Sequence, residues 1–117
     1  MANSGVTVIT ELSNYPITPD KIDISGVADD YLPGIFGKYE SEVAAFSIIK
    51  RCQERGDWRS FTLGDLKKVK ISKDTRLFIP AGVFWLVFGK FIVHKKRKYY
   101  LTEDFIQRCY ENFSVET

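Results

Sequence analysis

The pattern of apolar and polar positions becomes helical at Tyr39. Between Tyr39 and Cys52, apolar residues recur at spacings of three and four, while most of the charged residues fall off that stripe. Gly56 follows as a favourable stop, because glycine readily adopts the left-handed conformation that ends many helices. The sequence therefore predicts an amphipathic helix that starts at Tyr39, stops at Gly56 and buries one face.

Two further helices are predicted between this helix and the basic part of the chain. Thr62 can cap a short helix over about residues 63–69, and Asp65 stands three residues later, in the place of the acidic partner of a capping box. Residues 80–88 are apolar on almost every side and begin with Pro80, which suits the first turn of a helix. A strand is the alternative, because β-branched and aromatic residues dominate this segment. As a helix, it has to be buried against the domain or against a partner.

The last third of the chain predicts a hairpin followed by a helix. Two β-prone runs, residues 91–95 and 98–102, are separated by a tight basic turn. Thr102 can cap the helix that follows, and two acidic residues in its first turn suit the positive end of the helix dipole. One face of this helix is apolar, so we expect it to dock on the core through Phe105, Ile106, Cys109, Tyr110 and Phe113.

The beginning of the chain has no helical period. Residues 6–10 alternate like a short strand, and prolines and glycines mark the rest as turns and extended chain. The large apolar residues within 31–36 are too many for a free tail, so we expect part of this segment to pack on the domain. We therefore divide the chain into an irregular N-terminal arm, residues 1–38, and a domain, residues 39–117.

Composition restricts the class of protein. The 117 residues suit one domain, and 44% hydrophobic residues are enough for a packed core. No apolar run approaches the roughly 18 residues that span a bilayer, and the polar first residues do not look like a signal peptide. We therefore expect a cytoplasmic protein with no membrane partner.

Few residues suggest catalysis or metal binding. Cys52 and Cys109 are far apart in sequence, and His94 is the only histidine, so the chain has no zinc motif of recognisable spacing. We expect both cysteines to be small buried hydrophobic residues and His94 to face solvent on a strand. No catalytic triad, phosphate loop or calcium loop is recognisable. We expect no cofactor and no enzyme activity.

Positive charge is concentrated in the middle of the chain. The net charge is only +2, but residues 67–98 carry ten Lys and Arg against Asp74 alone, a net of +9, between two acidic ends. Most of these cations form two groups: Lys67, Lys68, Lys70, Lys73 and Arg76 upstream, and Lys95, Lys96, Arg97 and Lys98 in the hairpin turn. Such asymmetry is typical of a surface that meets a polyanion. The alternative is that these lysines keep the domain soluble and protect an edge strand.

The order of predicted elements resembles the winged-helix family. The predicted order is a helix, a short helix, an apolar helix that ends in glycine, a basic hairpin and a helix with an acidic first turn. The stretch VFGKFIVHKKRKYYLTEDFIQRC is similar to the part of the family's sequence that runs from the end of the third helix through the wing to the next helix. The resemblance covers about residues 39–114. It implies an α+β fold, a three-helix core with a β-hairpin wing and a C-terminal helix, preceded here by the irregular arm.

The resemblance also implies a role in binding nucleic acid. The third helix of DNA-binding winged helices presents polar side chains to base edges, whereas residues 80–88 here are apolar, and the connection that precedes them is longer than a compact helix-turn-helix allows. Reading of a base sequence is therefore not expected. The two basic groups instead suit backbone phosphates of duplex DNA or another nucleic acid, and they form one face if the fold brings them together.

Two hypotheses follow from the sequence. The first is a non-enzymatic winged-helix protein that binds nucleic acid through its phosphates in an accessory or regulatory role. The second is a protein interaction module of the same fold with no nucleic-acid role. In that case, Phe84, Trp85 and Phe88 of the apolar helix would contact a second copy or another protein.

Overall fold

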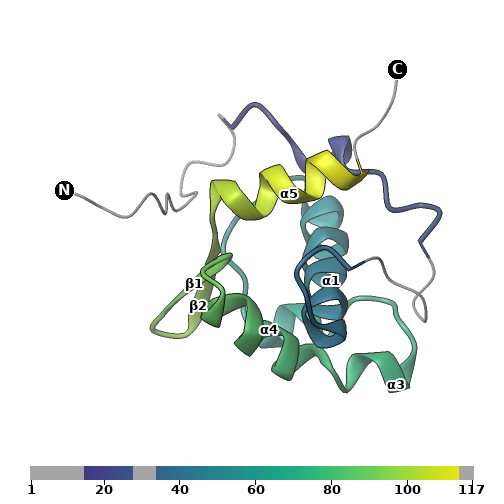
Figure 1. Cartoon of the computed structure of the whole chain (residues 1–117), viewed down its shortest axis with the longest axis vertical. Coiled ribbons are helices and arrows are strands. Elements are labelled where there is room, and N and C mark those ends of the chain that lie inside the picture. The colour runs from purple at the N-terminus through teal and green to yellow at the C-terminus, as the bar shows by residue number, and fades with distance from the viewer. Residues whose placement is uncertain (1–14, 28–33, 114–117) are drawn as a thin grey trace.

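A computed structural model describes residues 15–27 and 34–113. In these residues the chain combines helices packed around α1 with a two-stranded antiparallel hairpin at the edge of the molecule, which confirms the α+β class (Figure 1). The elements are the 3-10 helix η2 (Pro19–Lys21), α1 (Tyr39–Arg55), α2 (Leu63–Leu66), α3 (Lys73–Arg76), α4 (Ile79–Phe88), β1 (Ile92–Lys95), β2 (Lys98–Leu101) and α5 (Glu103–Phe113). The strand expected at residues 6–10 and the apolar residues at 31–33 lie outside the described ranges.

Helix α1 forms the centre of the core. It begins at Tyr39 and ends before Gly56, as predicted, and Gly56 has the left-handed φ of 83° while its N–H donates to the carbonyl of Cys52 at 2.7 Å. In Figure 1, α4 lies at the lower end of α1 and α5 crosses its upper end. Side chains of all three helices belong to one hydrophobic core.

Helix α4 packs on α1 through a glycine. The segment is a helix and not a strand, with Pro80 in its first turn. Gly82 is buried at the contact, where a Cβ would come within 2.7 Å of the Cβ of Ala44 and closer still to the carbonyl oxygen of Glu40. Ile79, Val83 and Leu86 are buried beside it. A residue without a side chain at position 82 therefore lets the two helices approach closely.

The connection between α2 and α4 differs from the prediction. The capping box of Thr62 and Asp65 is present, but α2 ends at Leu66 and not near residue 69. The connection then forms α3, which was not predicted, and Ser72 caps it by accepting a hydrogen bond from the N–H of Thr75. A helix of one turn has too few residues to show a hydrophobic period, so only its cap could have indicated it.

The hairpin and the last helix have the predicted form. Strand β1 pairs with β2 in a register that places Lys95 opposite Lys98 and leaves a two-residue turn. On its other edge β2 is joined by Phe61, which exchanges backbone hydrogen bonds of 3.0 and 2.8 Å with Tyr99. Thr102 caps α5 by accepting from the N–H of Phe105, as expected.

The described part of the arm lies against the helices. Glu42 of α1 is buried, and its carboxylate accepts hydrogen bonds from three successive backbone N–H groups, those of residues 35–37, at 2.6 to 2.9 Å. Burial raises the pKa of Glu42, although the three donors act in the opposite direction. Further upstream, the indole N–H of Trp58 donates to the carbonyl of Ile17 at 2.6 Å, and Ile22 is buried. These contacts tie the chain before α1 to the core.

Gly82→Ala is expected to destabilise the protein. The added methyl group would meet the backbone of α1, which cannot move aside like the end of a flexible side chain, so we expect a loss of about 1–3 kcal/mol in the free energy of unfolding. Gly64→Ala is the matched control, because a Cβ there meets only Thr62 Oγ1 at 3.6 Å and alanine favours a helix. Urea unfolding measures both, and equal stability of the two variants would contradict the close contact.

Candidate nucleic-acid interface

The turn of the hairpin carries four cations, Lys95, Lys96, Arg97 and Lys98, called here the basic tip. All four side chains are exposed, and none takes part in an ion pair with another described residue. With Tyr100 they line an open hollow on the hairpin. Tyr99 and Tyr100 are both half-buried, and Tyr99 stacks on Phe61 with ring centroids 5.5 Å apart. The tip is thus free to meet an anion.

Two lysines occupy backbone positions that favour glycine. Lys96 in the tip has a φ of 58°, and Lys90, between α4 and β1, has a φ of 67°. The left-handed conformation costs an ordinary L-residue about 1–2 kcal/mol, and the turns of hairpins usually place glycine or asparagine there. Lysine at both positions therefore lowers the stability of the fold. Backbone strain of this kind is common at functional sites.

The upstream basic cluster is less uniform. Lys67, Lys68, Lys70 and Lys73 are exposed. Arg76 is not, because its guanidinium turns inward and donates to the carbonyls of Val69 and Ile71 at 2.7 and 3.3 Å. Arg76 therefore holds the connection before α4 together, while the four lysines are available to a ligand.

The upstream cations do not all lie in one place. In Figure 1, α3, which carries Lys73, and the hairpin lie at opposite sides of the molecule, and α4 runs between them. Lys67 instead lines a groove at the start of α4 with Leu77 and Pro80. Lys73 is therefore separated from the basic tip, and a ligand that contacts both has to pass along α4.

The outer face of α4, which consists of Ala81, Phe84, Trp85 and Phe88, is largely left open by the described residues. Phe84 is 60% exposed and Phe88 is 71% exposed, and Leu77 just before the helix is 78% exposed. Trp85 lies edge-on to Phe84 and Phe88, with ring centroids 5.2 and 5.8 Å away. The uniformly apolar sequence of α4 thus corresponds to one buried face and one open face, and not to burial on all sides.

A groove joins this outer face to the hairpin. Pro80, Val83, Phe84 and Val87 line its α4 side, while His94 and Tyr99 line its hairpin side. His94 is exposed, as predicted, and its ring stacks on that of Tyr99 with centroids 4.3 Å apart and planes 11° from parallel. An exposed aromatic surface therefore continues from α4 to the base of the tip.

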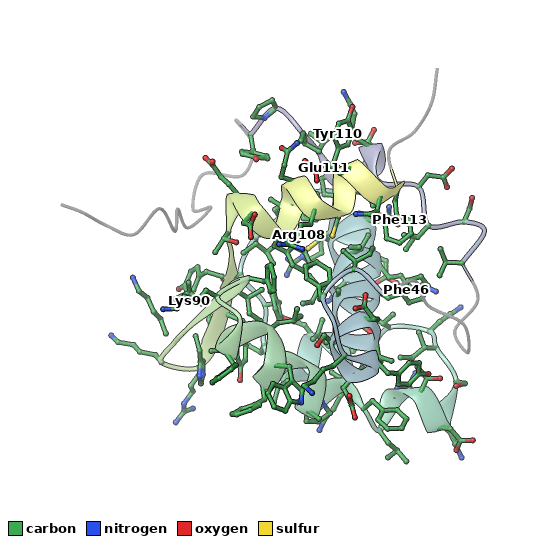
Figure 2. The ribbon with its side chains drawn as sticks, viewed as in Figure 1. Phe46, Lys90, Arg108, Tyr110, Glu111 and Phe113 are labelled. Carbon is green, nitrogen blue, oxygen red and sulfur yellow. The ribbon has the colours of Figure 1, made fainter. Side chains whose placement is uncertain are left out.

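Two cations near α4 were not part of the predicted site. The Lys38 Nζ lies 4.5 Å from the centroid of the Trp85 ring, a cation–π contact from the residue that precedes α1. Lys90 lies at the base of the hairpin and points away from the core (Figure 2). No local motif indicates Lys38, because its contact depends on the packing of α1 against α4. Lys90 could have been suspected from its place directly after the helix.

Metal sites, membrane-spanning helices and reactive thiols were looked for in the rest of the described chain. No group of three or more His, Cys, Asp or Glu within residues 15–27 and 34–113 is arranged to hold a metal ion. The helices of the same ranges are all too short or too polar to cross a bilayer. Cys52 and Cys109 are free and buried, as expected, and burial raises the pKa of Cys52 to about 12. Neither thiol is an accessible nucleophile.

Both cysteines are expected to resist alkylation in the folded protein. Only the thiolate reacts, and burial hides both sulfur atoms and raises both pKa values. Labelling with a thiol reagent at neutral pH should therefore proceed only at the rate of unfolding, and it should become fast in denaturant. Fast labelling of either cysteine without denaturant would show that the core is open there.

No family model, curated protein or solved structure matches the chain. The interpretation of the site therefore depends on the exposed cations, the strained lysines and the outer face of α4.

Proposed function

We propose that the chain is a non-enzymatic winged-helix protein that binds nucleic acid mainly through backbone phosphates, in an accessory or regulatory role. The order of elements supports the fold assignment: α1, the strand-like Phe61, α2, α4, the hairpin and α5 come in the order of that family, with the one-turn α3 inserted between α2 and α4. In this interpretation the hairpin is the wing and α4 is the third helix.

The observation that carries the proposed function is the basic tip. Four exposed cations, none of them paired with an acidic residue of the described ranges, form the end of the hairpin, and Lys96 carries its charge at a position where glycine would be less strained. Phosphate contacts need exposed Lys and Arg but no particular base sequence. The outer face of α4 offers base edges a single hydrogen-bonding side chain, the Trp85 indole N–H donor, which agrees with binding that largely ignores sequence.

The first test is the salt dependence of binding to duplex DNA. Affinity should fall steeply between about 50 and 200 mM salt, and changing all four tip residues to alanine should flatten the slope of log K against log salt by up to about four units. Arg97→Ala and Lys21→Ala form a matched pair, since each removes one exposed cation and only the first lies in the tip. No binding at low salt, or the same loss from Lys21→Ala, would refute phosphate binding by the tip.

Lys96→Gly should change stability and affinity in opposite directions. Glycine relieves the left-handed strain, so we expect the free energy of unfolding to rise by up to about 1 kcal/mol. Removal of the charge should at the same time weaken binding to DNA. If Lys96 only solvates the hairpin, the variant will gain stability with unchanged affinity for DNA. Thermal unfolding measures the stability, and fluorescence anisotropy of labelled DNA measures the affinity.

The exposure of Phe84 and Phe88 favours a second candidate function, an interaction with protein through the outer face of α4. A second copy of the chain would bury this face in a homodimer. Sedimentation velocity tests that version directly, because a homodimer has to dissociate when Phe84 or Phe88 is changed to a charged residue. A monomer at high concentration excludes it.

A further inference from the structure

The outer face of α4 is large enough to bind a ligand. Phe84 and Phe88 together leave roughly 200–300 Å² of ring surface in solvent, given about 150–250 Å² for a whole aromatic side chain. This area approaches the lower end of the range for the largest apolar patch on an ordinary monomer, about 300–600 Å², which is often functional. The ring of His94 extends this surface towards the hairpin.

The surroundings of this face are cationic. Lys38 lies over the Trp85 ring on one flank, and Lys90 follows the C-terminal end of α4. At the N-terminal end, the exposed Lys67 lines the groove that contains Leu77. An apolar aromatic surface with cations at both ends and on one side is complementary to a ligand that combines flat apolar rings with regular negative charge.

We propose that the outer face of α4 is a stacking platform for an unpaired polynucleotide strand, whose bases lie on Phe84, Phe88 and His94. Its phosphates would run from the basic tip to Lys67 and Lys73. Helix α4 is about 15 Å long, which corresponds to about four stacked nucleotides at about 3.4 Å each. This inference rests on the proposed function and specifies its ligand.

A duplex suits this face less well than a single strand. The flat faces of paired bases are hidden in the stack, and a groove presents base-edge donors and acceptors to the protein. Against the apolar residues of α4 those polar groups would lose water without gaining partners. Unpaired bases instead offer their faces, and stacking tolerates any sequence because every base has a π face.

A second copy of the chain also suits this face less well. Antiparallel packing of two α4 helices would bring Lys67 of one copy near Lys90 of the other, and parallel packing would bring like residues together. Either arrangement places cations opposite cations, which opposes association. The charges around the face therefore favour a polyanion.

The test compares a single strand with a duplex on the full chain. Oligothymidylate of about 12 nucleotides should bind more tightly than a duplex of the same length at the same salt concentration. Phe84→Leu and Phe88→Leu keep an apolar side chain but remove the ring, so each should weaken binding of the single strand by about fivefold or more and leave duplex binding unchanged. Trp85 fluorescence should report the strand directly, since Trp58 is fully buried.

Tyr110→Leu is the matched control, because this ring lies on α5 away from α4, and its loss should leave affinity unchanged (Figure 2). Oligouridylate should bind much like oligothymidylate, since stacking on the Phe84 and Phe88 rings does not involve the 2′-hydroxyl. Equal affinity for strand and duplex, wild-type affinity of both leucine variants, or a strong preference for the ribose strand would each overturn the platform.

The same experiment separates this inference from the proposed function. Salt-dependent duplex binding without preference for the single strand overturns only the platform. No binding of either oligonucleotide at low salt overturns both. A homodimer that buries Phe84 and Phe88 in sedimentation would assign the face to a second copy and overturn the platform as well.

Discussion

The close contact between α4 and α1 at Gly82 determines most of the surface. Because residue 82 has no side chain, the backbone of α4 lies against Glu40 and Ala44, and α4 buries one narrow face. Its opposite face is then left in solvent although it is made of large aromatic residues. The hairpin begins directly after α4, so the same contact also sets the position of the basic tip.

The resulting surface has charge at its ends and aromatic rings in its middle. The basic tip and α3 with its Lys73 lie at opposite sides of the molecule, and α4 with its outer face runs between them. Exposed phenylalanines lower the solubility of a protein because they favour aggregation. The left-handed backbone of Lys90 and Lys96 lowers the stability of the fold. Together they form a surface that suits a ligand with flat bases and regular phosphates.

The sequence predicted the elements whose ends have local signals. Gly56 stops α1, Thr62 caps α2 and Thr102 caps α5, and each does so through its own neighbours. Helix α3 was not predicted because a helix of one turn is too short to show a hydrophobic period. Phe84, Trp85 and Phe88 of α4 were named as a possible contact surface, but an apolar sequence alone could not show whether the domain itself covers them. The positions of the basic groups relative to one another depend on tertiary packing, which local sequence patterns do not predict.

If nucleic acid lies along the outer face of α4, a bound strand has to be close enough to that helix to react with it. Photocrosslinking of a single strand that carries 5-iodouracil, followed by peptide mass spectrometry, detects such contacts. We expect crosslinks at Phe84, Trp85 or Phe88, with others at the hairpin. Crosslinks confined to α1 and α5, with none on α4, would contradict this placement of the strand.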